Sequence, residues 1–99
     1  MALKIEWTEP VLKDLETISN YIEVEWSESL ADKFIDLVKE KVRTLAKHPA
    51  MGMASVKYPS VRSVKISKHN KLYYKVTNDK LILLSIFDTR QHPDKNLYR

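Results

Sequence analysis

Residues 61–87 read VRSVKISKHNKLYYKVTNDKLILLSIF, and this stretch decides the fold. Apolar and polar residues alternate through Val61–Ile66 and again through Lys71–Val76, which is the period of two expected of half-buried strands. Leu81–Phe87 is apolar on both faces, as in a central or doubly covered strand. Short polar turns separate the three segments, so they predict an antiparallel meander.

Two amphipathic helices are predicted upstream of the meander. Thr8 is a suitable N-cap for the first helix and Ser27 for the second, which His48-Pro49 ends. Each helix carries an apolar stripe at helical spacing, Val11, Leu15, Ile18 and Ile22 in the first, and Leu30, Phe34, Leu37, Val38, Val42 and Leu45 in the second. The short connection between them indicates an antiparallel hairpin that must cover an apolar surface.

The N-terminal residues Leu3–Trp7 alternate apolar and charged side chains, which predicts a short first strand. The element order is then strand, helix, helix, strand, strand, strand. This order predicts one α+β domain over residues 1–99, with the helical hairpin packed on one face of a small antiparallel sheet. Residues 50–60 read as a loop in which Met51 and Met53 serve packing rather than ligand binding.

Charge divides unevenly along the chain. Residues 1–50 carry seven Lys and Arg against ten Asp and Glu, a net −3, whereas residues 51–99 carry ten against three, a net +7. Strand phasing places part of the positive charge on the sheet face opposite the hairpin, at Lys65, Lys71 and Lys75 together with Tyr73. Arg62, Arg90 and Lys95 would extend this face. Such a face predicts a polyanionic or acidic partner, although lysines also serve simply to solvate a sheet.

Composition narrows the possible chemistry. Gly52 is the only glycine, which argues against phosphate-binding glycine loops, and the chain has no cysteine. The spacing of the three histidines makes a metal site improbable, and we expect no cofactor. No apolar run approaches the length of a membrane span, so we expect a cytoplasmic protein without a membrane partner.

The residues are compatible with two uses of the basic face, which are binding or cleaving a nucleic-acid backbone and simply solvating the sheet. Lys and Arg bind phosphodiester backbones and stabilise charge that develops during cleavage, and Tyr73 is a candidate stacking platform for an unpaired base. Arg90, soon after the last strand, is suited to clamp a phosphate. His92 belongs to the residue type that most often acts as a general acid or base. The alternative is that His92-Pro93 only ends the strand and has no catalytic role.

The layout resembles the RelE/ParE superfamily of toxins from bacterial type II toxin–antitoxin systems. The stretches that carry the resemblance cover nearly the whole chain; they are Ile5–Glu9, Lys47–Gly52, Val61–Ile66, Lys71–Val76 and Ile86–Gln91. The resemblance implies a small toxin neutralised by a cognate antitoxin, as a hetero-oligomer, with a homodimer as a further possibility. It also implies one of two targets, DNA gyrase for ParE-like members or messenger RNA on the ribosome for RelE-like members.

For the ribonuclease branch, the resemblance implies catalytic roles for Lys65, Lys71 and Arg90, and less clearly for His92. Lys71, however, stands where those nucleases usually have arginine, and Ser63 replaces another basic residue. Because lysine makes no bidentate guanidinium contact, and because the helical hairpin is long, we favour a gyrase-directed, ParE-like toxin. The alternatives are a ribosome-dependent mRNA endoribonuclease and a non-catalytic binding module, for which the basic face serves only to bind the antitoxin.

Overall fold

The computed structural model describes residues 2–89. In chain order the elements are β1 (Lys4–Trp7), α1 (Glu9–Glu25), α2 (Glu28–Lys47), η1 (Pro49–Met51), β2 (Met53–Ala54), β3 (Val61–Ser67), β4 (Asn70–Thr77) and β5 (Lys80–Asp88). The predicted α+β order is confirmed. The segment expected to be a loop adds the 3₁₀ turn η1 and the short strand β2.

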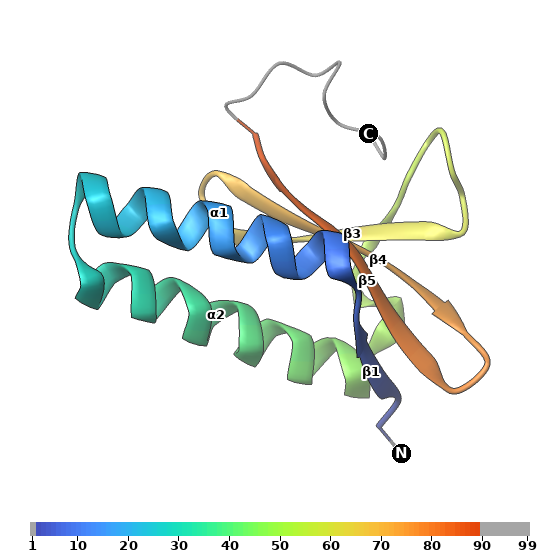
Figure 1. Cartoon of the computed structure of the whole chain (residues 1–99). Coiled ribbons are helices and arrows are strands. Elements are labelled where there is room, and N and C mark those ends of the chain that lie inside the picture. The colour runs from blue at the N-terminus through green and yellow to red at the C-terminus, as the bar shows by residue number, and fades with distance from the viewer. Residues whose placement is uncertain (1, 90–99) are drawn as a thin grey trace.

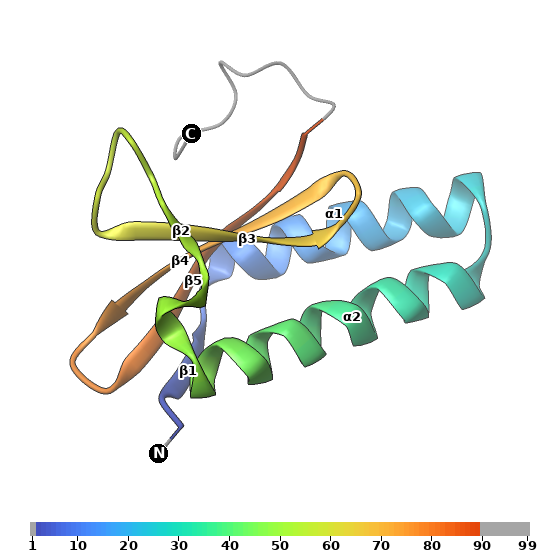
Figure 2. The same ribbon diagram turned by 180° about the vertical axis from the view of Figure 1, so that it is seen from behind.

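The strands form one sheet in the order β1-β5-β4-β3-β2, with the helical hairpin on one side (Figures 1 and 2). The sheet is antiparallel from β5 to β2, as the meander predicts, whereas β1 joins β5 in parallel. Parallel pairing is possible here because the whole helical hairpin separates β1 from the later strands and serves as the long crossover that parallel neighbours need. β5 is therefore an interior strand, which explains its apolar sequence.

Both helices begin at the predicted caps. The Thr8 hydroxyl oxygen accepts a hydrogen bond from the Val11 N–H at 3.4 Å, and the Ser27 hydroxyl accepts one from the Leu30 N–H at 3.1 Å. Thr8 also donates to the Leu83 carbonyl at 2.6 Å. This second bond ties the first turn of α1 to the middle of β5, so the cap fixes the helix to the sheet as well as starting it.

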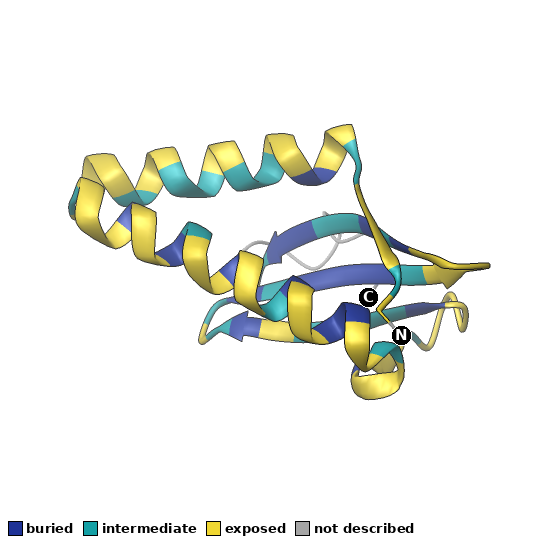
Figure 3. Cartoon of the chain, turned by 90° about the horizontal axis from the view of Figure 1, so that it is seen from below, coloured by how far each residue is buried: buried dark blue, intermediate teal, exposed yellow. Residues whose placement is uncertain are grey.

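The main core lies between the hairpin and the sheet (Figure 3). Its fully buried members include Val11, Val38, Leu45, Leu72, Tyr74, Leu81 and Leu83. The stripe of α1 is only half-buried after Val11, because the loop that joins the two helices projects beyond the end of the sheet (Figure 1). Apolar side chains near that end, Trp26 among them, are left exposed.

A second, smaller cluster lies on the other face of the sheet. It consists of Val61, Tyr73 and Phe87, with Leu84 packed beside them. An irregularity in the β4–β5 register shifts the alternation of β5, because Tyr73 and Tyr74 pair with Ser85 and Leu83 and thus skip Leu84. Leu81 and Leu83 face the main core before this point and Ile86 faces it afterwards. A bulge of this kind shifts the alternation of the strand that carries the extra residue.

Candidate functional site: a basic sheet face and the network behind it

The lysines of β3 and β4 lie on the sheet face opposite the helices. Ile66 and Leu72 belong to the helix-side core, so their strand neighbours Lys65 and Lys71 point to the other side. Lys65 lies directly opposite Lys71 in the register, and Lys75 lies opposite Val61 and Ile82. The face therefore joins a pair of facing cations to a third cation further along β4.

No carboxylate among residues 2–89 forms a salt bridge with Lys65, Lys71 or Lys75. The two ion pairs in this part of the chain join Lys4 to Asp79 at 3.7 Å and Lys80 to Glu6 at 3.6 Å, at the β1 edge of the sheet. Like charges that face each other across two strands destabilise a sheet by roughly 0.2–1 kcal/mol. A bound phosphate or carboxylate would relieve that repulsion, so the pair is suited to hold an anion.

Tyr73 does not have the exposure that a stacking platform needs. It was predicted on the basic face, and it does lie on that side, but its side chain is only 3% exposed and packs with Val61 and Phe87. A base can stack only on an accessible ring face. The prediction that Tyr73 stacks an unpaired base is therefore wrong for this structure, and the tyrosine forms part of the small outer cluster.

Arg62 lies on the helix side of the sheet, so the prediction that it extends the basic face is wrong. It pairs with Tyr74 in the register and has the same phase as Val64 and Ile66. Its guanidinium donates a 2.7 Å hydrogen bond to the carbonyl of Gly52, in the segment that follows η1. Arg62 thus holds the η1 segment against the sheet.

Tyr74 completes this network. Its hydroxyl accepts a hydrogen bond from the Gly52 N–H at 2.9 Å and donates one to the Pro49 carbonyl at 2.7 Å. Burial raises the pKa of the Tyr74 phenol above its ordinary value of 10.0, and the Gly52 N–H and the charge of Arg62 partly oppose that rise.

Gly52 is required by close approach. A Cβ added there would collide with the Tyr74 hydroxyl and lie 2.9 Å from the Ser63 carbonyl oxygen. Sequence reasoning used Gly52 only to exclude glycine loops. The lone glycine between two methionines was the available signal that the chain needs a side-chain-free position here.

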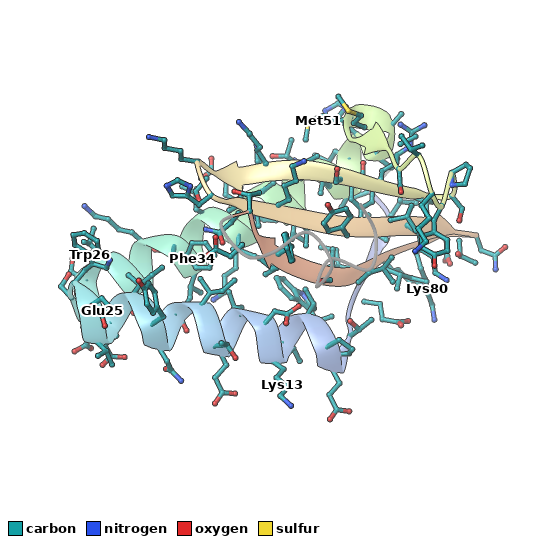
Figure 4. All side chains as sticks on the ribbon, turned by 90° about the horizontal axis from the view of Figure 1, so that it is seen from above. Lys13, Glu25, Trp26, Phe34, Met51 and Lys80 are labelled. Carbon is teal, nitrogen blue, oxygen red and sulfur yellow. The ribbon has the colours of Figure 1, made fainter. Side chains whose placement is uncertain are left out.

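The methionines of this segment do not pack in the loop as predicted. Met51 is 47% exposed and Met53 is 78% exposed, and Figure 4 shows Met51 at the periphery of the molecule. The β2–β3 connection also presents Val56, which is 97% exposed. The rim of the sheet near β2 is therefore apolar as well as basic.

Arg90, His92 and Lys95 lie outside the described residues. The last described residue, Thr89, is fixed to the β3–β4 turn, since its N–H donates to the His69 carbonyl at 2.7 Å and its hydroxyl donates to the same oxygen at 3.2 Å. Among residues 2–89, no group of three or more His, Asp or Glu side chains is placed to hold a metal ion, and no helix is long and apolar enough to cross a membrane.

The helical hairpin on one face of a small mixed sheet is the fold of solved ParE and YoeB structures. The chain belongs to the family described as the ParE toxin of the type II toxin–antitoxin system parDE, whose family model matches residues 5–93. It is accordingly a type II toxin, and membership implies a cognate antitoxin as its partner.

Solved structures share this fold. A chromosomal ParDE system from P. aeruginosa aligns with a TM-score of 0.76 and 20% identity, over 88% of this chain and 96% of that chain. A YoeB/ParE toxin from Agrobacterium tumefaciens aligns with a TM-score of 0.63 and 14% identity, over 87% and 98%. A YoeB dimer from Staphylococcus aureus gives 0.63 and 14%, over 88% and 97%. No curated protein matches the chain.

Proposed function

We propose that this toxin acts on DNA gyrase and that its antitoxin neutralises it by direct binding. The observation that carries the proposal is the chemistry of the basic face. Lys65, Lys71 and Lys75 supply positive charge there, while Arg62 faces the other way and His69 lines a cleft on the helix side. The match of residues 5–93 to the ParE family model supports the same assignment.

RNA cleavage requires more than positive charge. A base must remove the proton of the attacking hydroxyl and an acid must protonate the leaving oxygen. On the described part of the basic face, β3 and β4 present the amines of Lys65, Lys71 and Lys75 and no carboxylate or imidazole, and the phenol of Tyr73 is buried. This arrangement is better suited to binding an acidic protein surface or gyrase-bound DNA than to cutting RNA.

The decisive experiment is a supercoiling assay with purified gyrase and relaxed plasmid. Added toxin should stop supercoiling or trap cleaved DNA, and the purified antitoxin should restore activity. Lys71→Glu should weaken inhibition strongly, and Lys13→Glu is the matched control because Lys13 is exposed on α1, on the helix side (Figure 4). Full gyrase activity at a large molar excess of wild-type toxin would refute the proposal.

A ribosome-dependent endoribonuclease is the second candidate, favoured by the facing pair Lys65 and Lys71, which is placed to hold one phosphate. It predicts cleavage of mRNA in the ribosomal A site, with loss of cleavage in Arg90→Ala. Transcripts that stay intact after induction in cells would rule it out. A non-catalytic module predicts instead that induction leaves growth unaffected.

The same proposal extends to organisation and location. We infer that residues 1–99 act as a single toxin domain that assembles with its antitoxin into a hetero-oligomer, with a homodimer as the alternative assembly. Gyrase and ribosomes are both cytoplasmic, so either target places the working protein in the cytoplasm. Gel filtration of the toxin alone and with its antitoxin measures these states directly.

A further inference from the structure

The β2 edge of the sheet presents four exposed apolar side chains on one short segment. They are Met51, Met53, Val56 and Tyr58, and this set is called the β2 rim below. Val56 is the most exposed of them, with 97% of its surface open to solvent. Single exposed apolar residues need no explanation, but a group of them on a surface marks a contact with another molecule.

The β2 rim lies far from the end of the helical hairpin. β2 is the outermost strand of the sheet, and the loop that joins it to β3 projects at the opposite end of the molecule from the α1–α2 connection (Figures 1 and 2). Figure 4 shows Met51 near the one end and Trp26 at the other. The helix-side cleft, which Trp26 and Leu30 line, is therefore a separate surface.

The backbone beneath the β2 rim is held by its own hydrogen bonds. The Ser55 N–H donates to the Val61 carbonyl, and the Val61 N–H donates to the Tyr58 carbonyl, both at 2.8 Å. The Tyr58 N–H donates to the Ser55 hydroxyl at 3.2 Å, and Gly52 is bonded to the Tyr74 hydroxyl at 2.9 Å. A segment that is ordered before binding loses little conformational entropy in a complex, so the rim is preorganised for contact.

The β2 rim borders the basic face. Met53 pairs with Ser63 in the β2–β3 register, and Ser63 lies two residues before Lys65 on the same strand. Side chains two residues apart on a strand share a face, so Met53 lies on the side of the sheet that carries Lys65 and Lys71. A partner that contacts these lysines therefore also reaches the rim.

The chemistry of the β2 rim is that of a protein contact. Residues 49–60 contain one cation, Lys57, and no aspartate or glutamate, and the Lys57 Nζ lies 5.5 Å from the centre of the Tyr58 ring. Methionine and tyrosine are enriched where proteins bind one another. Duplex DNA presents mainly phosphates and polar base edges, which match Lys57 but not Val56 or Met53. An apolar pocket bordered by carboxylates would complement all of them.

We propose that the β2 rim is the contact of this toxin with the protein part of its target, and that Val56 and Met53 enter an apolar pocket bordered by carboxylates. The inference rests on the proposed action on gyrase and specifies which surface of the toxin binds the enzyme. Val56 is the anchor because it is fully accessible. Met53 adapts to the shape of the pocket, since its unbranched thioether side chain is flexible.

The test measures the toxin concentration that halves supercoiling by purified gyrase. Val56→Asp should raise this concentration by about tenfold, because a carboxylate would enter an apolar pocket bordered by like charges. Val24→Asp is the matched control, since it makes the same change at a valine that is 81% exposed on α1, and it should change the value less than about threefold. Val56→Leu keeps an apolar anchor and should inhibit like the wild type.

Two further variants examine the shape and the charge of the contact. Met53→Gln keeps the length of the side chain but makes it polar, and it should raise the half-inhibitory concentration by about threefold. Lys57→Gln should weaken inhibition at low salt and have little effect at high salt, because salt screens its attraction to carboxylates. All these side chains are exposed or in the β2 rim, so each variant should unfold at the same urea concentration as the wild type.

The outcomes separate the inference from the proposal on which it rests. If wild-type toxin inhibits gyrase and Val56→Asp inhibits as well as Val24→Asp, the inference is overturned and the action on gyrase stands. Absence of inhibition by wild-type toxin would overturn both. Fluorescence anisotropy with a labelled DNA duplex and with the purified antitoxin provides two more readouts. Loss of affinity of Val56→Asp for the duplex alone, or for the antitoxin with inhibition unchanged, would assign the β2 rim to that partner and overturn the inference.

Discussion

Replacing Tyr74 with phenylalanine removes one oxygen atom from the centre of the η1 network. In the folded protein that oxygen accepts from the Gly52 N–H at 2.9 Å and donates to the Pro49 carbonyl at 2.7 Å. The ring itself is fully buried in the main core, so phenylalanine keeps its packing. The substitution therefore isolates the contribution of the two hydrogen bonds.

The expected loss of stability follows from what happens to each partner. Gly52 is buried, so its N–H is left without a partner at a cost of about 1–3 kcal/mol. Pro49 is half-buried and its carbonyl can regain water, so loss of that bond costs about 0.5–1.5 kcal/mol. Tyr74→Phe should thus lower the free energy of unfolding by about 1.5–4.5 kcal/mol, or the Tm by roughly 8–22 °C for a domain of this size.

Urea unfolding followed by circular dichroism measures this change. Tyr21→Phe is the matched control, because it deletes the same atom from a tyrosine that is 51% exposed, and it should change stability by less than about 0.5 kcal/mol. If Tyr74→Phe were as stable as Tyr21→Phe, the two hydrogen bonds would not hold the η1 segment.

Three further predictions use the same unfolding assay. Gly52→Ala should cost about 1–3 kcal/mol, because its methyl group would collide with the Tyr74 hydroxyl, and wild-type stability would contradict that contact. The raised pKa of Tyr74 means that folding favours the protonated phenol, so its contribution is intact below pH 10.0 and is lost at higher pH. Tyr74→Phe should therefore flatten the alkaline decline, and an unchanged slope would contradict this. Lys65→Gln should raise stability by about 0.2–1 kcal/mol at low salt by removing repulsion from Lys71, whereas Lys75→Gln, which faces apolar partners, should not; equal effects would refute the repulsion.

Local patterns in the sequence were sufficient for most of the fold. Thr8 and Ser27 were recognised as caps because each places a side-chain oxygen just before an amphipathic run. Such an oxygen commonly accepts a hydrogen bond from a backbone N–H of the first helical turn. The three strands of the meander were recognised from alternation and polar turns. These signals lie within a few residues of one another, so they need no knowledge of the rest of the chain.

Pairing between distant segments was not predictable in the same way. β1 reads as a strand, but nothing within Leu3–Trp7 says that it joins β5 in parallel, because that choice depends on how the hairpin returns the chain to the sheet. The register irregularity at Leu84 was equally unpredictable, since a run of apolar residues has the same pattern with or without a bulge.

The basic face was predicted only in part, because alternation gives the side of a strand residue but not its burial by neighbouring strands. Alternation gave the correct side for Lys65, Lys71 and Tyr73, yet burial of Tyr73 depends on Val61 and Phe87 from neighbouring strands. Arg62 is the instructive error. Its phase within β3 already grouped it with the core-facing residues, although its charge suggested the opposite face. Phase decided the outcome because a guanidinium can stay on the core side when a carbonyl, here that of Gly52, accepts a hydrogen bond from it.

The positive charge of the second half of the chain therefore has two separate uses. Arg62 uses its guanidinium to hydrogen-bond the Gly52 carbonyl within the fold. Lys65, Lys71 and Lys75 remain available on the outer face. An apolar cleft lies behind that face, on the helix side.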